Sequence, residues 1–251
     1  MTTIKDFFSP TNTVNSIPYN TNQTISVLIK SIQAIARITY QSIYLIDYYN
    51  QCFLYVSDNP LFLCGHSAEE VKELGYQFYL DHVPENEQKM LVELNSNGFK
   101  FFDTFNKEDK LKCSMSYDFH LKYGRKKILV NHKITPILLT DEGRVWIALC
   151  FVSMSAKKTP GHIQFHLEGT SDYWKYSFET HKWKLRNGVM IKDEEKEVLR
   201  LSAEGLTMAE IANNMCKSTD AIKFYRRNLF EKLKVTNITE AISHAIIYKL
   251  L

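Results

Sequence analysis

The sequence has no long hydrophobic run and no export signal. Its longest strongly apolar stretch, residues 145–152, is far shorter than a membrane helix, which needs about 20 residues. Residues 1–22 are rich in Thr, Asn, Ser and Pro, and they lack the charged and then apolar pattern of a signal peptide. We therefore expect a flexible N-terminus at residues 1–22 and a cytoplasmic location.

The cysteines and histidines lack the spacing of metal sites. The cysteines contain no CxxC pair and are odd in number: Cys52, Cys64, Cys113, Cys150 and Cys216. Three of them stand in apolar surroundings, which predicts reduced thiols in the core. No HExxH motif and no helical i,i+4 pair occurs among His82, His120, His132, His162, His166 and His181. No metal is expected.

Sequence motifs of enzyme active sites are missing as well. The chain contains no Gly-x-Ser-x-Gly, no P-loop, no dinucleotide fingerprint and no paired-carboxylate site. Its N-terminal half also lacks the alternating strands and helices of a receiver domain. We expect no enzyme, no catalytic residue and no evident cofactor.

The composition is that of a soluble globular protein. The 251 residues are 45 % hydrophobic and 24 % charged. This length allows two small domains, each with a core of its own.

Residues 207–233 carry the strongest local pattern. Thr207 and Glu210 form a capping box in front of a short helix, and Ser218 is placed to cap a second helix that runs to about Lys234. Six cations and two acids lie within residues 217–234, so the remainder of this +3 chain sums to −1. Two short helices with cations on the second one are typical of a helix-turn-helix DNA reader.

The second helix has two distinct faces. Apolar side chains recur on an inward stripe formed by Ile222, Tyr225, Leu229 and Leu233. Lys223 and Arg227 share another face, and such a cationic face suits phosphates and guanine edges. Charge alone is equally consistent with a solvated surface helix.

The order of residues around this helix resembles the LuxR-type (GerE) helix-turn-helix over residues 191–245. The matching positions are Glu195, 197–199, Leu201, 205–207, 210–212, Ser218, 222–223, 232–233, Val235, Asn237 and 240–241. The sequence departs from the family pattern at residues 191–192, Glu194 and Ala221, and Tyr225 stands where His is common. The changes on the second helix leave the base preference open.

The resemblance implies a four-helix DNA-binding domain at residues 189–251, with the second helix of the motif in the major groove. Lys223 and Arg227 would reach bases or nearby phosphates, and Phe224 would lie against a thymine methyl group or a sugar. The remaining DNA contacts, at phosphates or at the helix start, would come from Thr207, Lys217, Ser218, Arg226 and Lys232. The last helix would pair with its twin in a homodimer through Ala241, Ile242, Ala245 and Ile246.

In the N-terminal half, the sequence pattern predicts two strands, then several helices, and then three more strands. Residues 23–41 read as an amphipathic helix that either packs on its own domain or forms a dimer. Strands are expected at 43–47, 52–56, 115–122, 127–138 and 144–154, with helices from residues 67 and 87 between them.

This order, with local runs at 53–59, 62–71 and 80–87, resembles a PAS domain. The resemblance implies a sensory domain at residues 23–154, built as a five-stranded antiparallel sheet with helices over one face. Residues 98–114 contain no histidine for a haem, and the Asn-Cys-Arg motif of a flavin photosensor is absent. The signal would be an unidentified small-molecule ligand or a partner.

Residues 155–188 alternate as two or three extra strands, which we read as a β-hairpin module that connects the domains, with a hinge at 186–188. The expected fold class is therefore α+β, with an all-α C-terminal domain. We interpret the chain as a dimeric transcription regulator that binds double-stranded DNA, with RNA polymerase as a further candidate partner. The alternatives are a sigma-factor-like promoter reader, or a constitutive DNA binder whose PAS-like part only holds the dimer.

Overall fold

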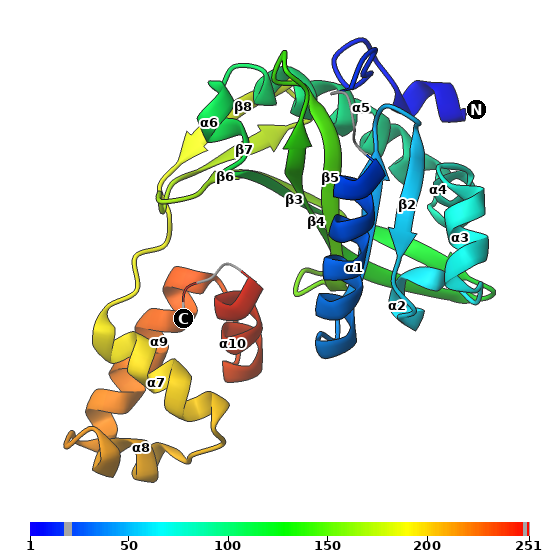
Figure 1. Cartoon of the computed structure of the whole chain (residues 1–251). Coiled ribbons are helices and arrows are strands. Elements are labelled where there is room, and N and C mark those ends of the chain that lie inside the picture. Colours follow the sequence, from blue (N-terminus) through cyan, green and yellow to red (C-terminus); the bar gives the residue numbers. More distant parts are fainter. Residues whose placement is uncertain (18–21, 248–249, 251) are drawn as a thin grey trace. The chain divides into compact units, whose positions relative to one another are not determined.

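The computed structural model describes residues 1–17, 22–247 and 250. The chain divides into two compact units, Met1–Arg186 and Asn187–Leu251 (Figure 1). Among the described residues, no helix is both long enough and apolar enough to cross a membrane.

Unit 1 is built on one antiparallel sheet with the strand order β2-β1-β5-β4-β3-β6-β7-β8. The strands of the described residues are β1 (Ser42–Asp47), β2 (Cys52–Val56), β3 (Cys113–Tyr123), β4 (Lys126–Leu139), β5 (Val145–Met154), β6 (Gly161–Leu167), β7 (Tyr173–Ser177) and β8 (Lys182–Arg186). The five strands predicted before residue 155 are therefore present and adjacent.

Helices cover the inner face of this sheet. They are α2 (Pro60–Leu63), α3 (Ala68–Leu74), α4 (Gln77–His82), α5 (Glu85–Phe102) and α6 (Lys107–Lys110). Ser67 and Glu70 form a capping box at the predicted start of α3, with the Glu70 N–H donating to Ser67 Oγ at 3.2 Å. The main core lies between α5 and the sheet, around buried side chains such as Phe62, Phe78 and Phe119.

The predicted N-terminal helix is α1 (Asn22–Ile38), and it packs on the opposite, outer face of the sheet (Figure 1). Its Ile32 is buried against Ile43, Leu45 and Trp146. Because successive side chains of a strand point to opposite faces of the sheet, β1 and β5 bury side chains on both of its faces.

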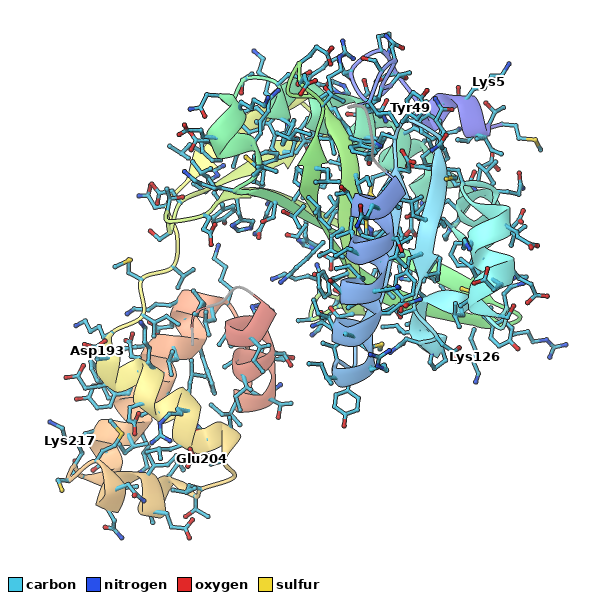
Figure 2. The ribbon with its side chains drawn as sticks, in the orientation of Figure 1. Lys5, Tyr49, Lys126, Asp193, Glu204 and Lys217 are labelled. Atoms are coloured by element: carbon cyan, nitrogen blue, oxygen red, sulfur yellow. The ribbon has the colours of Figure 1, made fainter. Side chains whose placement is uncertain are left out.

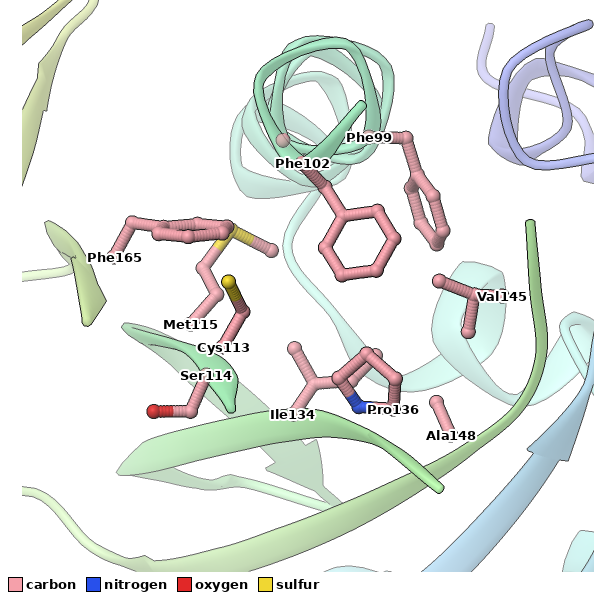
Figure 3. Close-up of a pocket in the computed structure, with 11 residues that line it drawn as sticks. Phe99, Phe102, Cys113, Ser114, Met115, Ile134, Pro136, Val145, Ala148 and Phe165 are labelled. Atoms are coloured by element: carbon pink, nitrogen blue, oxygen red, sulfur yellow. The ribbon is translucent and has the colours of Figure 1, made fainter. Parts of the chain in front are cut away.

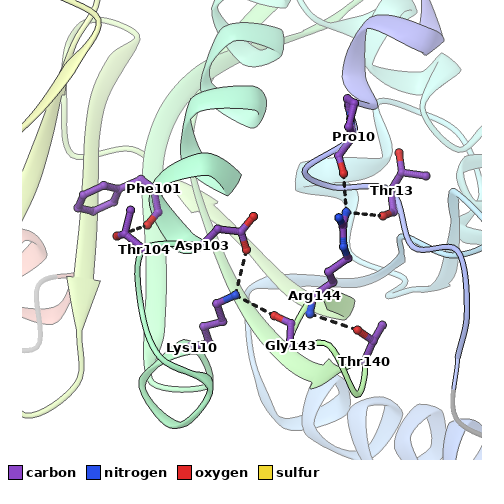
Figure 4. Close-up of polar contacts among 9 residues, drawn as sticks. All are labelled: Pro10, Thr13, Phe101, Asp103, Thr104, Lys110, Thr140, Gly143 and Arg144. Carbon is purple, nitrogen blue, oxygen red and sulfur yellow. Dashed lines mark hydrogen bonds and ion pairs between the residues drawn. The ribbon is translucent and has the colours of Figure 1, made fainter.

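The first seventeen residues pack on the main core, where we had expected a flexible segment. A 3-10 helix, η1 (Ile4–Phe7), buries Phe7, and the backbone oxygen of Phe7 accepts a hydrogen bond from Asn95 Nδ2. Arg144 holds the same segment through the carbonyl oxygens of Pro10 and Thr13, the latter at 3.1 Å (Figure 4). The aromatic ring of Phe7 buries apolar surface on the core, although the mostly polar residues around it predicted a flexible segment. Residues 18–21 of the expected flexible segment lie outside the described residues.

Strands β6, β7 and β8 extend the sheet, whereas we had expected a connecting module of their own. β6 pairs with β3, so that Met115 lies opposite Phe165. Aromatic packing on α5 holds the extension, since the Trp183 ring stacks on Phe101 at 4.9 Å between centroids. Aromatic pairs of this kind add about 0.5–1.5 kcal/mol beyond the area that they bury.

Unit 2 consists of four helices around a separate core. They are α7 (Asp193–Ala203), α8 (Met208–Asn214), α9 (Thr219–Leu233) and α10 (Ile238–Ile247). Gly205 ends α7 with a φ of 87°, a conformation that favours glycine, and the Leu206 N–H then donates to the Leu201 carbonyl oxygen. Leu199, Ile211, Ile222 and Leu229 are buried between the helices, and Ile222 and Leu229 belong to the predicted inward stripe.

Candidate nucleic-acid interface

The start of each motif helix is held by its own side-chain cap. Thr207 Oγ1 accepts from the Glu210 N–H at 3.4 Å, and the Thr207 N–H donates to Glu210 Oε2 at 2.8 Å, which completes the predicted capping box of α8. Ser218 Oγ accepts from the Ala221 N–H at 3.2 Å at the start of α9. Both caps use orphan N–H groups of a first helical turn. The two hydroxyls therefore set where α8 and α9 begin.

The turn between α8 and α9 is tight. Cys216 takes a φ of 52°, and the Lys217 N–H donates to the Ala212 carbonyl oxygen at 2.9 Å. Lys217 is exposed in this turn (Figure 2). The turn places an ammonium group directly in front of α9.

α9 divides its side chains between the core and solvent. Ile222, Leu229 and Leu233 are buried, and Tyr225 packs half-buried beside them. On the other side, the exposed fraction of Phe224 is 50 %, and Lys223 and Arg227 are exposed with it. The outward side of α9 therefore presents one aromatic ring between two cations.

The exposed cations of α9 are only weakly engaged. Lys223 Nζ lies 2.9 Å from Asp220 Oδ1, and both side chains are mostly exposed. The guanidinium of Arg227 lies 5.5 Å from the ring centroid of Phe224, and that of Arg226 lies at the same distance from Phe230. Exposed ion pairs contribute about 0–1 kcal/mol, so these groups can turn to an anionic ligand at little cost.

Lys232 is engaged inside the domain, although we had predicted a phosphate contact. Its Nζ lies 2.6 Å from Oε2 of Glu195, which is fully buried and also accepts the Lys192 N–H at 2.9 Å. A buried carboxylate that loses its partner costs about 3–5 kcal/mol. Lys232 therefore joins α9 to α7 and is not free for DNA.

Two residues in the first turn of α9 were not predicted from the sequence as DNA contacts. Thr219 and Asp220 are exposed next to Lys223. In helix-turn-helix proteins the first residues of the recognition helix contact base edges. The capping pattern at Ser218 already fixed the start of this helix, and that signal could have identified both residues.

The predicted dimer residues of α10 are split between core and surface. Ala241 and Ala245 are completely buried in the core of unit 2, so they are not available to a second copy. Ile242 is half-buried, and the exposed fraction of Ile246 is 62 %. The apolar stripe that we read as a dimer face is in part the face that α10 turns to its own domain.

Unit 1 contains two neighbouring cavities between α5 and the sheet. The first has a volume of about 40 Å³ and an almost wholly apolar lining that includes Phe99, Phe102 and Phe165 (Figure 3). The second has a volume of about 30 Å³, and its lining includes Phe7 and Asn95. Met115 and Ile134 line both cavities.

Tyrosine hydroxyls give the second cavity its polar character. Its lining includes Tyr48, Tyr76, Tyr79 and Tyr117. Burial raises the pKa of the Tyr79 and Tyr117 hydroxyls well above their usual range, so both stay neutral. The cavity therefore offers uncharged hydrogen-bonding groups in an apolar surrounding. Among the described residues, no group of three or more His, Cys, Asp or Glu side chains could hold a metal ion.

The chain was compared with known proteins. A family model described as "Bacterial regulatory proteins, luxR family" (GerE) matches residues 193–245. No curated protein matches the chain.

Several solved structures are similar over most of the chain. They include the phage VqmA–DPO complex (16 % identity, 91 % of this chain and 93 % of that chain, TM-score 0.34) and the Vibrio cholerae VqmA dimer without target DNA (17 %, 86 % and 86 %, 0.35). Escherichia coli SdiA is similar at 15 % identity over 90 % of this chain and 91 % of that chain, with a TM-score of 0.28. The family match covers α7, α8, α9 and most of α10. The C-terminal unit of this chain is a helix-turn-helix domain of the luxR family.

Proposed function

We propose that the chain is a transcription regulator that binds double-stranded DNA through α9. The observation that carries this proposal is the division of α9 into a buried apolar stripe and an exposed face of Lys223, Phe224 and Arg227. The match of residues 193–245 to the luxR family model supports the same role. The exposed face meets the needs of a groove reader, because cations attract phosphates and donate to guanine edges.

In this proposal the first turns of α9 enter the major groove. Lys223 and Arg227 donate to bases or nearby phosphates, and Phe224 packs against a thymine methyl group or a sugar. Lys217 and Arg226 hold phosphates on either side. Thr207 and Ser218 fix the starts of α8 and α9 and lie exposed toward the same ligand.

The double variant Lys223→Ala with Arg227→Ala tests the DNA-binding surface. Two lost base or phosphate contacts cost about 1–3 kcal/mol each, so the affinity for a specific duplex should fall at least about 30-fold. The matched control is Arg125→Ala with Lys126→Ala, which removes the same two charges from the exposed β3–β4 turn. Fluorescence anisotropy measures the affinities, and circular dichroism checks the fold. Equal affinities of the two variants would refute the assignment.

We also infer that unit 1 is a PAS-like sensory domain. Two strands before the helices and three after them lie in one antiparallel sheet, with α2 to α5 over one face. The cavities of this face are small, and side chains that move apart there would admit a small neutral compound, with an apolar part beside Phe102 and a hydrogen-bonding part at the tyrosines. A screen of such compounds by thermal shift is the test. Ligands of the first cavity should raise the melting temperature of the wild type and not of Ala148→Leu, which fills space there. A compound panel that moves neither protein would argue for a scaffold without a ligand.

The proposed regulator acts as a homodimer. Ile242 and Ile246 of α10 remain available for a contact between two DNA-binding units, since only the alanines of the predicted set are buried. Two copies would then read half-sites about 34–36 Å apart. The outward side of α1 offers a second contact between the two copies.

A further inference from the structure

The outer face of β7 and β8 carries a dense row of cations. The strand register alternates, so Trp174, Tyr176 and Trp183 point inward to the core while their neighbours point outward. Lys175 of β7 lies directly opposite Lys184 of β8 on this outward side. Lys182 and Arg186 follow on the same side of β8. We call Lys175, Lys182, Lys184 and Arg186 the β7–β8 cationic face.

These four cations are exposed. In residues 1–17, 22–247 and 250, none of the four forms an ion pair. Like charges directly opposite each other in an antiparallel pair are destabilising. The pairing of Lys175 with Lys184 therefore costs stability in the free chain, and an anionic ligand would relieve that cost.

A simpler role for lysines on an edge strand is to prevent pairing with other chains. That role fits β8, which is the last strand of the sheet. It does not account for Lys175, because β7 has a hydrogen-bonded strand on both sides. It also does not account for the aromatic neighbour, since Tyr173 lies opposite Arg186 and stacks with the His166 ring at 5.6 Å. The cations form a surface two strands wide, beyond the charged edge.

We propose that the β7–β8 cationic face is a second DNA contact, which binds phosphates of the duplex beside the site that α9 reads. This inference rests on the proposed function. Outward side chains on a strand repeat about every 6.8 Å, so Lys182, Lys184 and Arg186 form a ladder along a phosphate backbone. Lysine and arginine contacts of this kind neutralise phosphates without reading sequence.

The chain connection favours the same duplex as the ligand. Only residues 187–192, which have no regular structure, separate Arg186 from the start of α7. The seven steps from Arg186 to Asp193 span at most about 25 Å when fully extended. Once α9 holds DNA, this linker keeps the β7–β8 cationic face tethered to the same duplex, which raises the local concentration of phosphates for this face.

The test replaces all four cations by glutamine, as Lys175→Gln, Lys182→Gln, Lys184→Gln and Arg186→Gln in the full chain. The matched control makes the same charge change at four other exposed cations: Lys5, Lys89, Arg125 and Lys126. Affinity for a duplex with flanking DNA is measured by anisotropy at several salt concentrations. Each lost phosphate contact lowers the slope of log affinity against log salt by about 0.9.

The proposal expects a slope that is about 2 to 4 smaller for the fourfold variant than for the control. The fourfold variant should lose the same affinity whether the flanking DNA is specific or non-specific in sequence. It should lose none on a duplex trimmed to the site that α9 binds. Equal slopes for variant and control would overturn it, and so would unchanged DNA binding combined with lost binding to an acidic protein.

The same experiments distinguish a failure of this second contact from a failure of the proposed function. If Lys223→Ala with Arg227→Ala abolishes specific binding while the fourfold variant matches its control, only the second contact fails. If the wild type does not bind DNA at all, both proposals fail.

Discussion

A buried histidine in unit 1 makes the stability of the protein depend on pH. His132 is fully enclosed, and its Nε2 shares a hydrogen bond with the Tyr44 hydroxyl, which in turn contacts the Tyr79 hydroxyl. Burial lowers the pKa of His132 to about 3. The neutral imidazole therefore persists in the folded chain over the whole range in which an ordinary histidine becomes charged.

Acid should unfold the protein through this residue. The folded pKa of about 3 lies below the ordinary value of 6.5, so the unfolded chain binds the proton first. The stability contributed by the neutral ring is present above pH 6.5 and is lost as the pH falls toward 3, at up to about 1.4 kcal/mol per pH unit. We expect urea unfolding to show a steeper loss between pH 7 and pH 5 for the wild type than for His132→Gln, which cannot titrate. Parallel pH profiles of the two proteins would contradict this account.

At the scale of single elements, the sequence predicted those features that local chemistry decides. The capping residues Ser67, Thr207 and Ser218 marked helix starts that the structure confirms. The alternation in residues 115–154 predicted β3, β4 and β5, because strands with one buried face repeat every two residues. Two short helices, α4 and α6, were missed, since a few residues carry too little periodicity to indicate a helix.

The sequence failed where the partner of an element decides its role. An apolar stripe on α10 predicts burial, but it cannot tell burial in the same domain from burial in a dimer, and Ala241 and Ala245 lie in the domain core. Lys232 is indistinguishable from a phosphate ligand until Glu195, 37 positions earlier in the chain, is placed beside it. In the same way, the alternation after residue 160 predicted strands but not their pairing with β3, which is a long-range choice.

At the scale of the whole molecule, α1 offers a surface for a second copy. Val27, Ser31, Ala34 and Ile38 follow one another at steps of four, three and four residues, the spacing of a helix–helix seam. All four are exposed, with exposed fractions of 58 % for Val27 and 82 % for Ile38. The opposite side of α1 is already occupied by Ile32 and its neighbours on the sheet. The small residues in the middle of the seam let two backbones approach closely, which favours an identical helix as the occupant.

Charge placed on this seam should separate the proposed dimer. The double variant Val27→Asp with Ile38→Asp would bury carboxylates without partners in the interface, at about 3 kcal/mol or more for each. We expect the dissociation constant of the dimer to rise at least about 100-fold in sedimentation experiments, and binding to a duplex with two half-sites to weaken while binding to one half-site stays the same. The control, Ser26→Asp with Gln33→Asp, adds the same charge to exposed positions of α1 outside the seam and should remain dimeric. If the seam variant is as dimeric as this control, α1 is not the contact, and the exposed Ile246 on α10 is left as the place where two copies meet.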